Sequence, residues 1–327
     1  MANNCLAREA SLEYQEVRYK LAETLEDMFL FPVVGKEYAD ALRQNNELDL
    51  ASSHQVFADQ ATQLLQNIFP DGHLAVILSQ DSNVDHRQRR TPPPAIQQAE
   101  KLTDDIAYLK LLHHPGDEKT LQKLADFIAS VRGVETLIID VRKNFGGGLL
   151  EIDLLFSALY DTETPLLYMD LRTKAEEQGF SSLEQTPQLT INKSPPAGIV
   201  RRIHSALPSE SPALANTKVF VLTSNKTPSA AEHLTLALKR TARAAVIGET
   251  TAGLGHFGET IVLGHGFEVF TPIGATIDPD TGKGWEGVGV LPDHKVASSE
   301  ALALALELAG VSGKTAERIQ NKRSEFD

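Results

Sequence analysis

The chain has 327 residues, a hydrophobic fraction of 42% and a formal net charge of −13 at pH 7. A chain of this length can bury a large core and is long for one compact domain, so we expect two regions. The acidic balance argues against nucleic acid and anionic membrane surfaces as partners, because both attract basic proteins. Cys5 is the one cysteine of the sequence, which excludes an internal disulfide and a thiolate metal cluster.

Targeting and membrane segments are not expected either. Residues 1–20 are polar and charged and lack the apolar stretch of a signal peptide. No apolar run of the sequence approaches the ~20 residues that a bilayer-spanning helix needs. We therefore expect a soluble, cytoplasmic protein without a membrane span.

The N-terminal region, residues 1–80, is predicted to be a helical domain. Apolar residues recur at helical spacing from Leu12 to Phe29, and Pro32 is expected to break that helix. Two more helices are predicted, one from Tyr38 to about residue 46 and one over residues 52–68. A Pro-Asp-Gly turn over 70–72 then leads into a strand that ends at residue 78.

His73 lies between that turn and that strand. A lone histidine in such a place can be a turn residue bonded to local backbone. The start of a strand is also a rigid support for a general base. Both interpretations stay open on the position alone.

Residues 81–102 are predicted to be a linker. Their first part, 81–94, is charged, carries three consecutive prolines and has no hydrophobic pattern, which is typical of an exposed loop or hinge.

The C-terminal region, residues 103–327, alternates strands with helices, which predicts an α/β core. Strands are expected over 106–112, 136–141, 166–171, 219–222, 243–248, 259–263, 267–271 and 274–277. Helices are expected over 117–131, 149–159, 229–240 and 298–309. A long polar insertion over 173–213 is either a lid or specificity element or a plain surface loop.

Ser229 lies where a buried strand turns into an apolar-periodic helix. It can be an ordinary N-cap, because Glu232 three residues later completes a capping box. It can also be a nucleophile at a strand-to-helix turn, provided that partners come from elsewhere in the chain.

Two glycine-rich turns each follow a predicted strand. One spans residues 144–148 with Gly146, Gly147 and Gly148, and the other spans residues 248–255. The first lacks the lysine of a P-loop and the spacing of a dinucleotide fingerprint, so neither nucleotide interpretation holds. Either turn can be purely structural, but glycine also lets backbone N–H groups approach a ligand closely, as an anion hole requires.

These pieces, in this order, resemble peptidase family S41, the tail-specific or C-terminal processing proteases. Four stretches carry the resemblance: residues 137–148 (LIIDVRKNFGGG), 222–232 (LTSNKTPSAAE), 246–253 (VIGETTAG) and 285–293 (WEGVGVLPD). The Asp-Gly-His sequence at 71–73 and the helical N-terminal part look most like the interphotoreceptor retinoid-binding-protein-like branch.

The resemblance implies a fold of the ClpP/crotonase type, with stacked ββα units and a helical N-terminal domain. It also implies that Ser229 is the nucleophile and that the backbone N–H groups of Gly147 and Ala230 form the oxyanion hole. Residues 76–107 are too few for the PDZ domain that processing proteases insert there, so substrate tethering by a PDZ domain is not expected.

The base departs from the commonest family pattern. Many members use a lysine in the second glycine turn, where this sequence has Leu254, and Lys226 is too close to Ser229 in sequence to replace it with confidence. Tricorn-like members use a histidine and a glutamate, and His73 and Glu286 stand at the matching places.

The residues fit such a triad chemically. A serine hydroxyl needs a base to become nucleophilic, imidazole titrates near neutral pH, and a carboxylate can fix its tautomer. His256 is the rival base, and the absence of a working base is the third possibility. Asp140 and Arg142 are expected to fasten their loop, and no metal-ligand spacing or cofactor motif stands out.

The sequence therefore predicts a serine peptidase that acts on a peptide or protein through an acyl-enzyme on Ser229. Two alternatives stay open: a non-proteolytic carrier of a hydrophobic, retinoid-like or fatty-acid-like ligand, and a specialised acyl hydrolase, transferase or cyclase. Oligomerisation also stays open.

Overall fold

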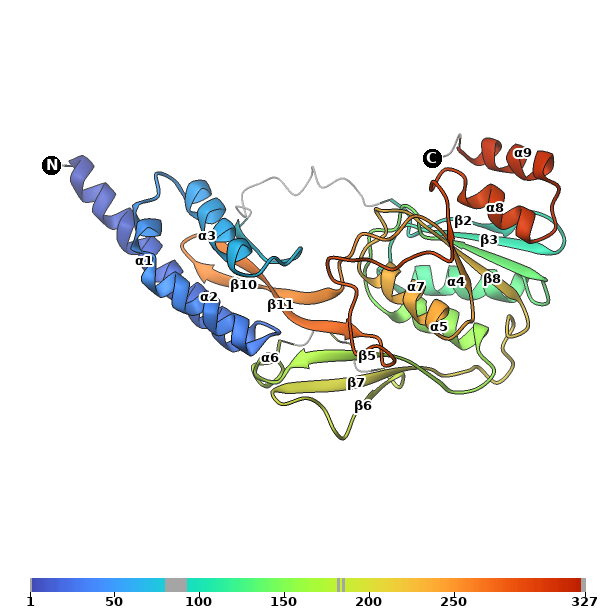
Figure 1. Ribbon diagram of the computed structural model, residues 1–327, viewed down its shortest axis with the longest axis horizontal. Helices are drawn as coiled ribbons and strands as arrows, with labels where there is room; N and C mark the ends of the chain where they lie inside the picture. The colour runs from blue at the N-terminus through green and yellow to red at the C-terminus, as the bar shows by residue number, and fades with distance from the viewer. Residues whose placement is uncertain (1, 80–92, 181–182, 184–185, 325–327) are drawn as a thin grey trace.

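The computed structural model describes residues 2–79, 93–180, 183 and 186–324 of the chain. Figure 1 shows the N-terminal helices at one end of the molecule and the C-terminal helices at the other, with β-sheet between them. The helices are α1 (Ala2–Met28), α2 (Pro32–Gln44), the 3-10 helix η1 (Asn46–Leu50), α3 (His54–Ile68), α4 (Glu118–Ser130), α5 (Leu150–Leu159), α6 (Thr173–Glu177), α7 (Ala230–Arg240), α8 (Ala301–Leu308) and α9 (Gly313–Ser324). The strands are β1 (Ala75–Leu78), β2 (Ile96–Lys101), β3 (Ile106–Leu111), β4 (Thr136–Asp140), β5 (Thr164–Arg172), β6 (Leu189–Ile191), β7 (Ile199–Ala206), β8 (Lys218–Thr223), β9 (Ala245–Gly248), β10 (His256–Gly264), β11 (Phe267–Ile277) and β12 (His294–Lys295).

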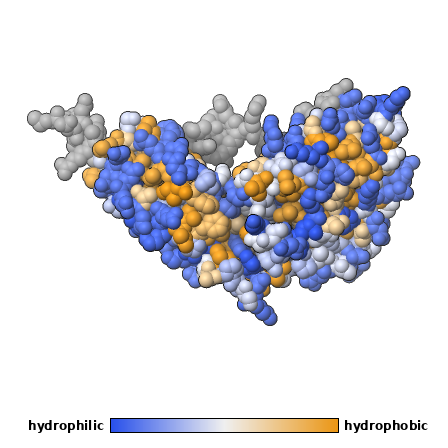
Figure 2. Space-filling model, in the orientation of Figure 1, coloured by the Kyte–Doolittle hydropathy of each residue, from blue (hydrophilic) through white to orange (hydrophobic). Residues whose placement is uncertain are grey.

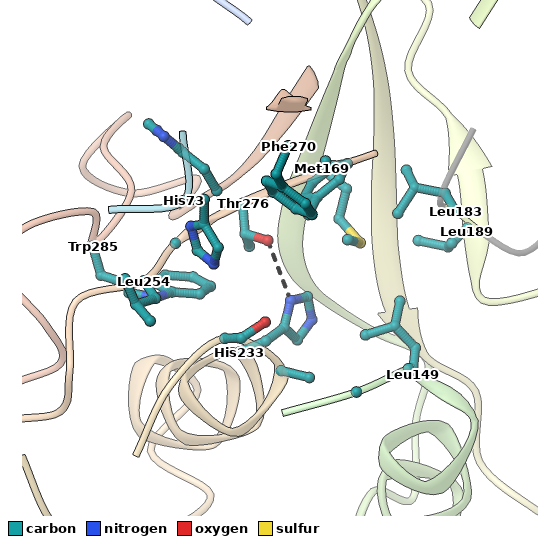
Figure 3. A pocket seen from close by; sticks show the side chains of 18 of the residues that line it. His73, Leu149, Met169, Leu183, Leu189, His233, Leu254, Phe270, Thr276 and Trp285 are labelled. Carbon is teal, nitrogen blue, oxygen red and sulfur yellow. Dashed lines mark hydrogen bonds between the residues drawn. The ribbon is translucent and has the colours of Figure 1, made fainter. Parts of the chain in front are cut away.

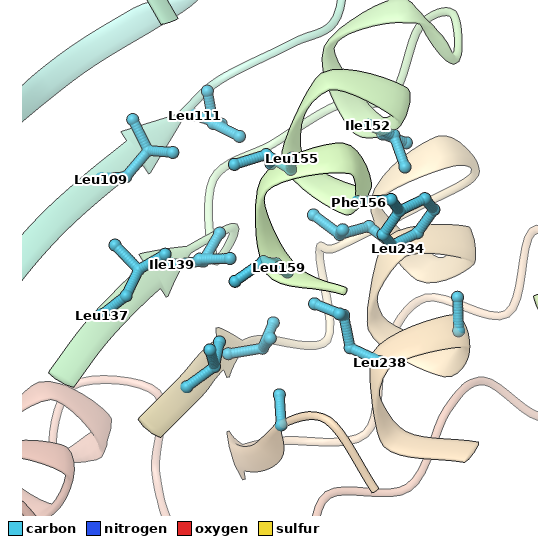
Figure 4. Close-up of a cluster of buried hydrophobic side chains, with 14 of the residues drawn as sticks. Leu109, Leu111, Leu137, Ile139, Ile152, Leu155, Phe156, Leu159, Leu234 and Leu238 are labelled. Atoms are coloured by element: carbon cyan, nitrogen blue, oxygen red, sulfur yellow. The ribbon is translucent and has the colours of Figure 1, made fainter. Parts of the chain in front are cut away.

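A parallel sheet with the order β12-β9-β8-β4-β3-β2 forms the centre of the C-terminal region, and only its edge strand β2 runs antiparallel among the described strands. Successive side chains of a strand point to opposite faces. In β4, Leu137 and Ile139 therefore join the core with α4, α5 and α7, whereas Ile138 joins the core with α8 and α9. Because both faces are covered, these strands read as continuous apolar runs. Figure 4 shows the first of these cores.

The order of strands in this sheet brings two distant loops together. β4 and β8 are neighbours in parallel register, with Asp140 opposite Leu222. The carboxyl ends of parallel strands meet at one edge, where ligand sites of α/β sheets form. The glycine loop between β4 and α5 therefore lies beside the turn between β8 and α7.

An antiparallel sheet, β1-β11-β5-β7-β6 with β10 also paired to β11, joins the two ends of the molecule. The N-terminal helices share one core with this sheet, in which Val17 and Leu21 of α1 join Phe267 and Val269 of β11. The predicted α/β class with a helical N-terminal region is thus confirmed. The division at residues 80 and 103 stays a prediction, as does the ClpP/crotonase assignment.

The predicted linker 81–102 is wrong in its last part. Ile96–Lys101 is the strand β2, which pairs with β3. This edge strand has the sequence IQQAEK and is half exposed, so no apolar alternation reveals it. Residues 81–92 of that prediction lie outside the described part of the chain.

The polar insertion 173–213 is not a plain surface loop, because it contains α6, β6 and β7. β7 pairs with β5 from Thr164 to Arg172. Its polar residues hid the strand: Arg201 is bonded to Asp170 and His204 to Asp153, so their charges are compensated rather than solvated.

Three smaller boundaries also differ from the prediction. The expected strands 267–271 and 274–277 form the single strand β11, which continues through Pro272, and α9 was not predicted. Pro32 begins α2 rather than only ending α1, because proline suits the first turn of a helix, where its missing N–H costs nothing. At Gly35 of α2, a Cβ would lie 2.4 Å from the carbonyl oxygen of Leu25, so glycine allows α2 to pack closely on α1.

The surface carries both polar and apolar side chains on the face in Figure 2. Exposed large apolar side chains include Val33, Leu50 and Val262, and single exposed residues of this kind are normal for soluble domains. No helix in the described ranges combines the length and apolarity needed to cross a bilayer. Oligomerisation stays untested.

Candidate active site

Ser229 has a backbone conformation that ordinary helix caps do not have. Its φ is 54° and its ψ is −124°, between β8 and α7. At the start of α3, by contrast, Ser53 has φ −161° and its Oγ accepts from the N–H of Val56 at 3.3 Å, as an N-cap should. A non-glycine residue at positive φ costs about 1–3 kcal/mol, and such strain clusters at functional sites.

Glu232 holds this strained turn in place. It is fully buried, and its Oε2 accepts from the backbone N–H of Ser229 at 2.9 Å, the glutamate half of the predicted capping box. Its carboxylate also accepts from Thr251 Oγ1 at 2.5 Å and from the N–H groups of Gly253 at 2.7 Å and Leu254 at 2.9 Å. A buried carboxylate needs such a set of donors. Glu232 therefore fastens the second glycine turn to the Ser229 turn.

The glycine loop packs directly against Ser229. A Cβ built on Gly146 would lie 3.0 Å from the Cβ of Ser229 and 3.7 Å from the nitrogen of Ala230. Gly147 has φ +133°, and a Cβ there would lie 2.2 Å from the carbonyl oxygen of His114. Glycine is therefore required at position 147 both by conformation and by space.

Two backbone donors next to Ser229 have no acceptor within the described part of the chain. The N–H of Gly146 donates to Asn144 Oδ1 at 2.7 Å and is occupied. Among the described residues, by contrast, no acceptor is found for the N–H of Gly147 or for the N–H of Ala230. Both residues line the same pocket as Ser229. Two free N–H groups beside a hydroxyl are the arrangement that stabilises an oxyanion.

Ser229 opens onto a pocket of about 280 Å³. One part of its lining is apolar and comes from Leu149, Met169, Leu183, Leu189, Phe270 and Trp285. In Figure 3 the rings of His73 and His233 approach this cavity from opposite sides, with Thr276 between them. The pocket thus combines an apolar lobe with a few polar groups, as sites for small ligands and side chains do.

One polar wall, which we name the turn cluster, consists of Asp71, His73, His256 and Glu286. Asp71 is buried, and its Oδ1 accepts from the N–H of His73 at 2.9 Å while its Oδ2 pairs with His256 Nδ1 at 2.7 Å. Burial alone would raise the pKa of Asp71, but the hydrogen bond and charge of His256 outweigh it and lower this pKa.

Glu286 clamps the turn that carries His73. It accepts from the backbone N–H groups of Gly72 at 3.2 Å, Gly255 at 2.6 Å and His256 at 3.0 Å. One ring nitrogen of His73 and one oxygen each of Asp71 and Glu286 lie within 4.8 Å of one another. These three could share an ion, but both carboxylates already accept several protein donors.

The structure brings together all six site residues that the sequence predicted. Ser229, His73, Gly147, Ala230 and His256 line one pocket, and Glu286 lies directly behind it. No hydrogen bond between the His73 ring and Glu286 is found in the described part of the chain, and Nδ1 of His73 is buried without a partner. The His73 ring and the Glu286 carboxylate therefore lie near each other without forming the expected hydrogen bond.

Leu254, which stands where many family members have a lysine, and Lys226 lie in different surroundings. The side chain of Leu254 lines the pocket and packs against Gly72. Lys226 lines a separate hollow with Lys110 and Arg142. Arg142 is bonded to Asp140 at 2.6 Å, which fastens the loop after β4.

The opposite wall was missed from the sequence. We name it the relay: Asp153 of α5, His204 of β7 and His233 of α7. His233 Nε2 lies 2.7 Å from His204 Nδ1, and His204 Nε2 lies 2.7 Å from Asp153 Oδ1. All three are buried, and His233 Nδ1 lies 3.5 Å from the hydroxyl of Thr276. Burial, together with neighbouring His204 and His114, lowers the pKa of His233 well below its usual value, so this ring is neutral.

The relay has no local motif, because its members come from three separate elements. The one available signal was the spacing of His233, which lies one helical turn after Ser229 and therefore on the same side of α7.

With this geometry established, the comparisons with known proteins become informative. The model of peptidase family S41 matches residues 105–296. The chain belongs to peptidase family S41. This membership supports a peptidase function and includes the segments of Ser229, Gly147 and Glu286, while His73 lies before the matched range.

Two solved structures agree with this chain in fold, and a third is similar over part of its length. The tricorn protease is 12% identical with a TM-score of 0.55, and the match covers 98% of this chain and 37% of that one. A lipoprotein from Streptococcus agalactiae is 18% identical with a TM-score of 0.53 over 90% of this chain and 95% of that one. The photosystem II D1 C-terminal processing protease is 23% identical with a TM-score of 0.44, over 69% of this chain and 48% of that one.

The S41 chain described here thus spans about half of the D1 processing protease and just over a third of the tricorn protease. At these identities the likeness to the tricorn protease and the streptococcal lipoprotein shows a shared fold, and fold alone does not fix activity. The retinoid-binding-protein-like branch and the absence of a PDZ domain stay predictions.

Proposed function

We propose that this S41 protein is a serine peptidase that cleaves peptide bonds through an acyl-enzyme on Ser229. One observation carries the proposal: a strained serine shares a pocket with two backbone N–H groups and a histidine nitrogen for which no partner is found among the described residues. A purely structural helix cap would need none of these features.

The proposed mechanism assigns one role to each group. His73 takes the proton of Ser229 as its Oγ attacks the scissile carbonyl carbon. The N–H groups of Gly147 and Ala230 bind the oxygen that becomes negative in the tetrahedral intermediate. His73 then gives the proton to the leaving amine, and water, activated by the same ring, releases the acyl group.

Glu286 acts mainly by placement in this proposal. Its bonds to Gly72, Gly255 and His256 fix the turn that carries His73. Its charge, within 4.8 Å of the ring, also favours the imidazolium that forms during the reaction. Hydrogen bonds between catalytic groups are often long in ligand-free sites and shorten when substrate binds, so a bond between His73 and Glu286 can form at that stage.

The substrate follows from the shape of the pocket. Met169, Leu183 and Leu189 form a small apolar cluster on the side of the pocket built by the 173–213 insertion. We propose that this lobe receives an apolar side chain of the peptide next to the bond that is cut.

His256 is the second candidate for the base. Its Nδ1 is already bonded to Asp71, which would leave Nε2 as the free nitrogen of a histidine–aspartate pair. It is the rival base expected from the sequence, and the variants described in the Discussion show which of the two histidines acts as the base.

The competing function is storage or transport of an apolar ligand, which the apolar lobe favours. At about 280 Å³, however, the pocket is slightly smaller than the range typical of ligand sites, ~300–1,000 Å³. A peptide side chain fits this volume better than a long isoprenoid or acyl chain.

Covalent labelling tests the proposal. A biotinylated fluorophosphonate should label the wild-type protein at Ser229, as mapped by mass spectrometry, and Ser229→Ala should remove the label while thermal unfolding stays cooperative. Ser53→Ala is the matched control, because it removes an ordinary cap and should cost about 1 kcal/mol of stability without changing the label. A folded wild-type protein that stays unlabelled and instead copurifies with stoichiometric lipid would overturn the proposal.

A further inference from the structure

The two proposed anion-hole donors belong to the starts of two different helices. Gly147 lies in the loop that leads into α5, and Ala230 is the first residue of α7. The distance between the two N–H groups therefore depends on how α5 and α7 sit relative to each other.

Apolar packing alone fixes that relation loosely. In the shared core, Ile152 and Phe156 of α5 lie near Leu234 and Leu238 of α7 (Figure 4). Packed apolar side chains permit small sliding motions between helices. A misplacement of about 1 Å at a reacting centre can cost about 100-fold in rate, so a tighter constraint is needed near the helix starts.

The relay supplies such a constraint near the starts of α5 and α7. Asp153 is the fourth residue of α5 and His233 is the fourth residue of α7, and His204 of β7 bridges them. Both contacts of His204 are 2.7 Å long, and its side chain is fully buried. Hydrogen bonds of this kind depend strongly on distance and angle, unlike apolar contacts.

The protons of the relay can be placed in one order. Asp153 accepts from His204 Nε2–H, and His204 Nδ1 in turn accepts from His233 Nε2–H. His233 Nδ1 is then left as an acceptor for the hydroxyl of Thr276, 3.5 Å away in β11. Each neutral ring has one donor and one acceptor nitrogen, so no ring can turn over without losing a bond.

We propose that Asp153, His204 and His233 are positioning residues that set the spacing of the Gly147 and Ala230 N–H groups by tying α5 to α7 at their first turns. The inference rests on the proposed function, because it gives the relay a role only if these donors bind an oxyanion. It adds to that function a buried histidine pair, His204 and His233. This pair acts by placing the two N–H donors and takes no part in the proton transfer assigned to His73.

The same two helices offer a matched control. At their far ends, the hydroxyl of Tyr160, the C-cap of α5, bonds to Thr241 Oγ1, the C-cap of α7, at 2.6 Å. This bond also joins α5 to α7, but it lies away from both donors. Tyr160→Phe therefore removes an inter-helix bond without loosening the helix starts.

Asp153 gives the sharpest pair of variants. Asp153→Ala removes the acceptor of His204, whereas Asp153→Asn keeps an oxygen in the same place. The exchange should be tolerated because the other oxygen, Oδ2, is buried without a partner among the described residues and can become an NH2 group. Asp153 also borders a surface groove, so the alanine variant should fold.

The experiment measures the second-order rate of labelling by a fluorophosphonate, together with the melting temperature, for wild type and the three variants. Asp153→Ala should label at least about tenfold more slowly, and Asp153→Asn should stay within about threefold of wild type. Tyr160→Phe should lower the melting temperature and leave the labelling rate unchanged. Asp153→Ser, whose hydroxyl is too short to reach His204, replaces the alanine variant if that variant does not fold.

The outcomes separate the two proposals. A wild-type protein without label at Ser229 contradicts the proposed function and this inference with it. A labelled wild type whose Asp153→Ala variant loses melting temperature but labels as fast as Tyr160→Phe contradicts the inference alone, because the relay would then only stabilise the fold.

Discussion

The two polar walls of the pocket use histidine in opposite ways. In the turn cluster, His73 is half-buried, and its Nδ1 has no partner among the described residues, although one of its ring nitrogens lies within 4.8 Å of oxygens of two carboxylates. In the relay, His204 and His233 are buried and each is bonded through its ring to a neighbour at 2.7 Å. His73 thus differs from the two relay histidines, and also from His256 of its own wall, whose Nδ1 is bonded to Asp71.

This difference indicates which wall can do proton chemistry. A histidine whose nitrogens are both engaged in a buried network must break that network before it moves a proton. A histidine on a clamped turn, whose ring is held by no such network, can take up a proton without breaking one. We therefore expect the two walls to fail differently when their histidines are removed: loss of His73 should lower the rate with little change in stability, whereas loss of a relay histidine should lower stability as well as rate.

The largest expected effect comes from His73→Ala. The loss of a general base should lower kcat for a peptide or activated ester by about 10²–10⁴-fold, while the melting temperature changes little because the ring forms no hydrogen bond in the described structure. Steady-state kinetics and thermal unfolding of the same preparation check this. His256→Asn, which can still donate to Asp71, is the control: a greater loss of kcat in this variant than in His73→Ala would make His256 the base.

Gly147→Ala should give the next largest effect. A Cβ at this position would lie 2.2 Å from the carbonyl oxygen of His114, so the loop must shift and carry its N–H away from Ser229. We expect kcat to fall by about 10²–10³-fold with a smaller change in KM.

The neighbouring glycine makes a matched control for this change. A Cβ at Gly148 would lie 3.7 Å from the same carbonyl oxygen, an ordinary contact, and Gly148 does not have the positive φ of Gly147. Gly148→Ala should therefore remain near wild type. Equal losses of kcat in both variants would show that any added methyl disturbs the loop. The loss in Gly147→Ala could then not be assigned to displacement of the Gly147 N–H.

The contrast between the walls also explains what the sequence could predict. Ser229, Gly147 and Glu286 lie in compact motifs whose spacing along the chain carries the signal, and the apolar runs of β4 and β8 predicted both strands, although not that they are neighbours. His204 has no such context, because a histidine in a strand with two arginines looks like an exposed edge. Only the fold shows that Asp153 and His233 reach it from two helices.

Sequence patterns also failed to reveal β2 and the strands of the 173–213 insertion. Both were predicted without strands because their polar side chains hid the alternation. In β7 those side chains are bonded to acids of neighbouring elements, a form of burial that hydrophobic patterns cannot reveal. The strained φ of Ser229 is likewise invisible in sequence, so the sequence alone leaves both the cap and the nucleophile open.

Removing a histidine of the relay should lower the free energy of unfolding. His204→Leu leaves the Asp153 carboxylate and the His233 Nε2–H buried without their partner, which should cost about 2–4 kcal/mol in the free energy of unfolding. Urea unfolding measures this. His294→Leu, at an exposed position of β12, is the control and should change stability by less than about 0.5 kcal/mol. A cost as small as that of the control would mean that the relay contributes no stability.

The smallest expected effect concerns the pH dependence of stability. His114, whose backbone pairs with the glycine loop, is fully buried, and burial together with His113 lowers its pKa to about 3. Below its unfolded pKa of about 6.5, the unfolded state binds a proton that the folded state does not, so stability must fall as pH decreases from about 6.5 toward 3. For this single group the slope is at most about 1.4 kcal/mol per pH unit. His233 adds a contribution of the same sign.

His114→Gln removes this titration and keeps a side chain that can bond to Asn144, which lies 3.3 Å from His114 Nε2. Urea unfolding at pH 7.5, 5.5 and 4.5 should give a shallower decline for the variant than for wild type, and the curves should differ in slope rather than only in height. Parallel curves would mean that His114 becomes protonated in the folded protein, and that the glycine loop which it supports tolerates a charge at its base. In that case the rigidity of the anion hole would have to come from Glu232 and the relay alone.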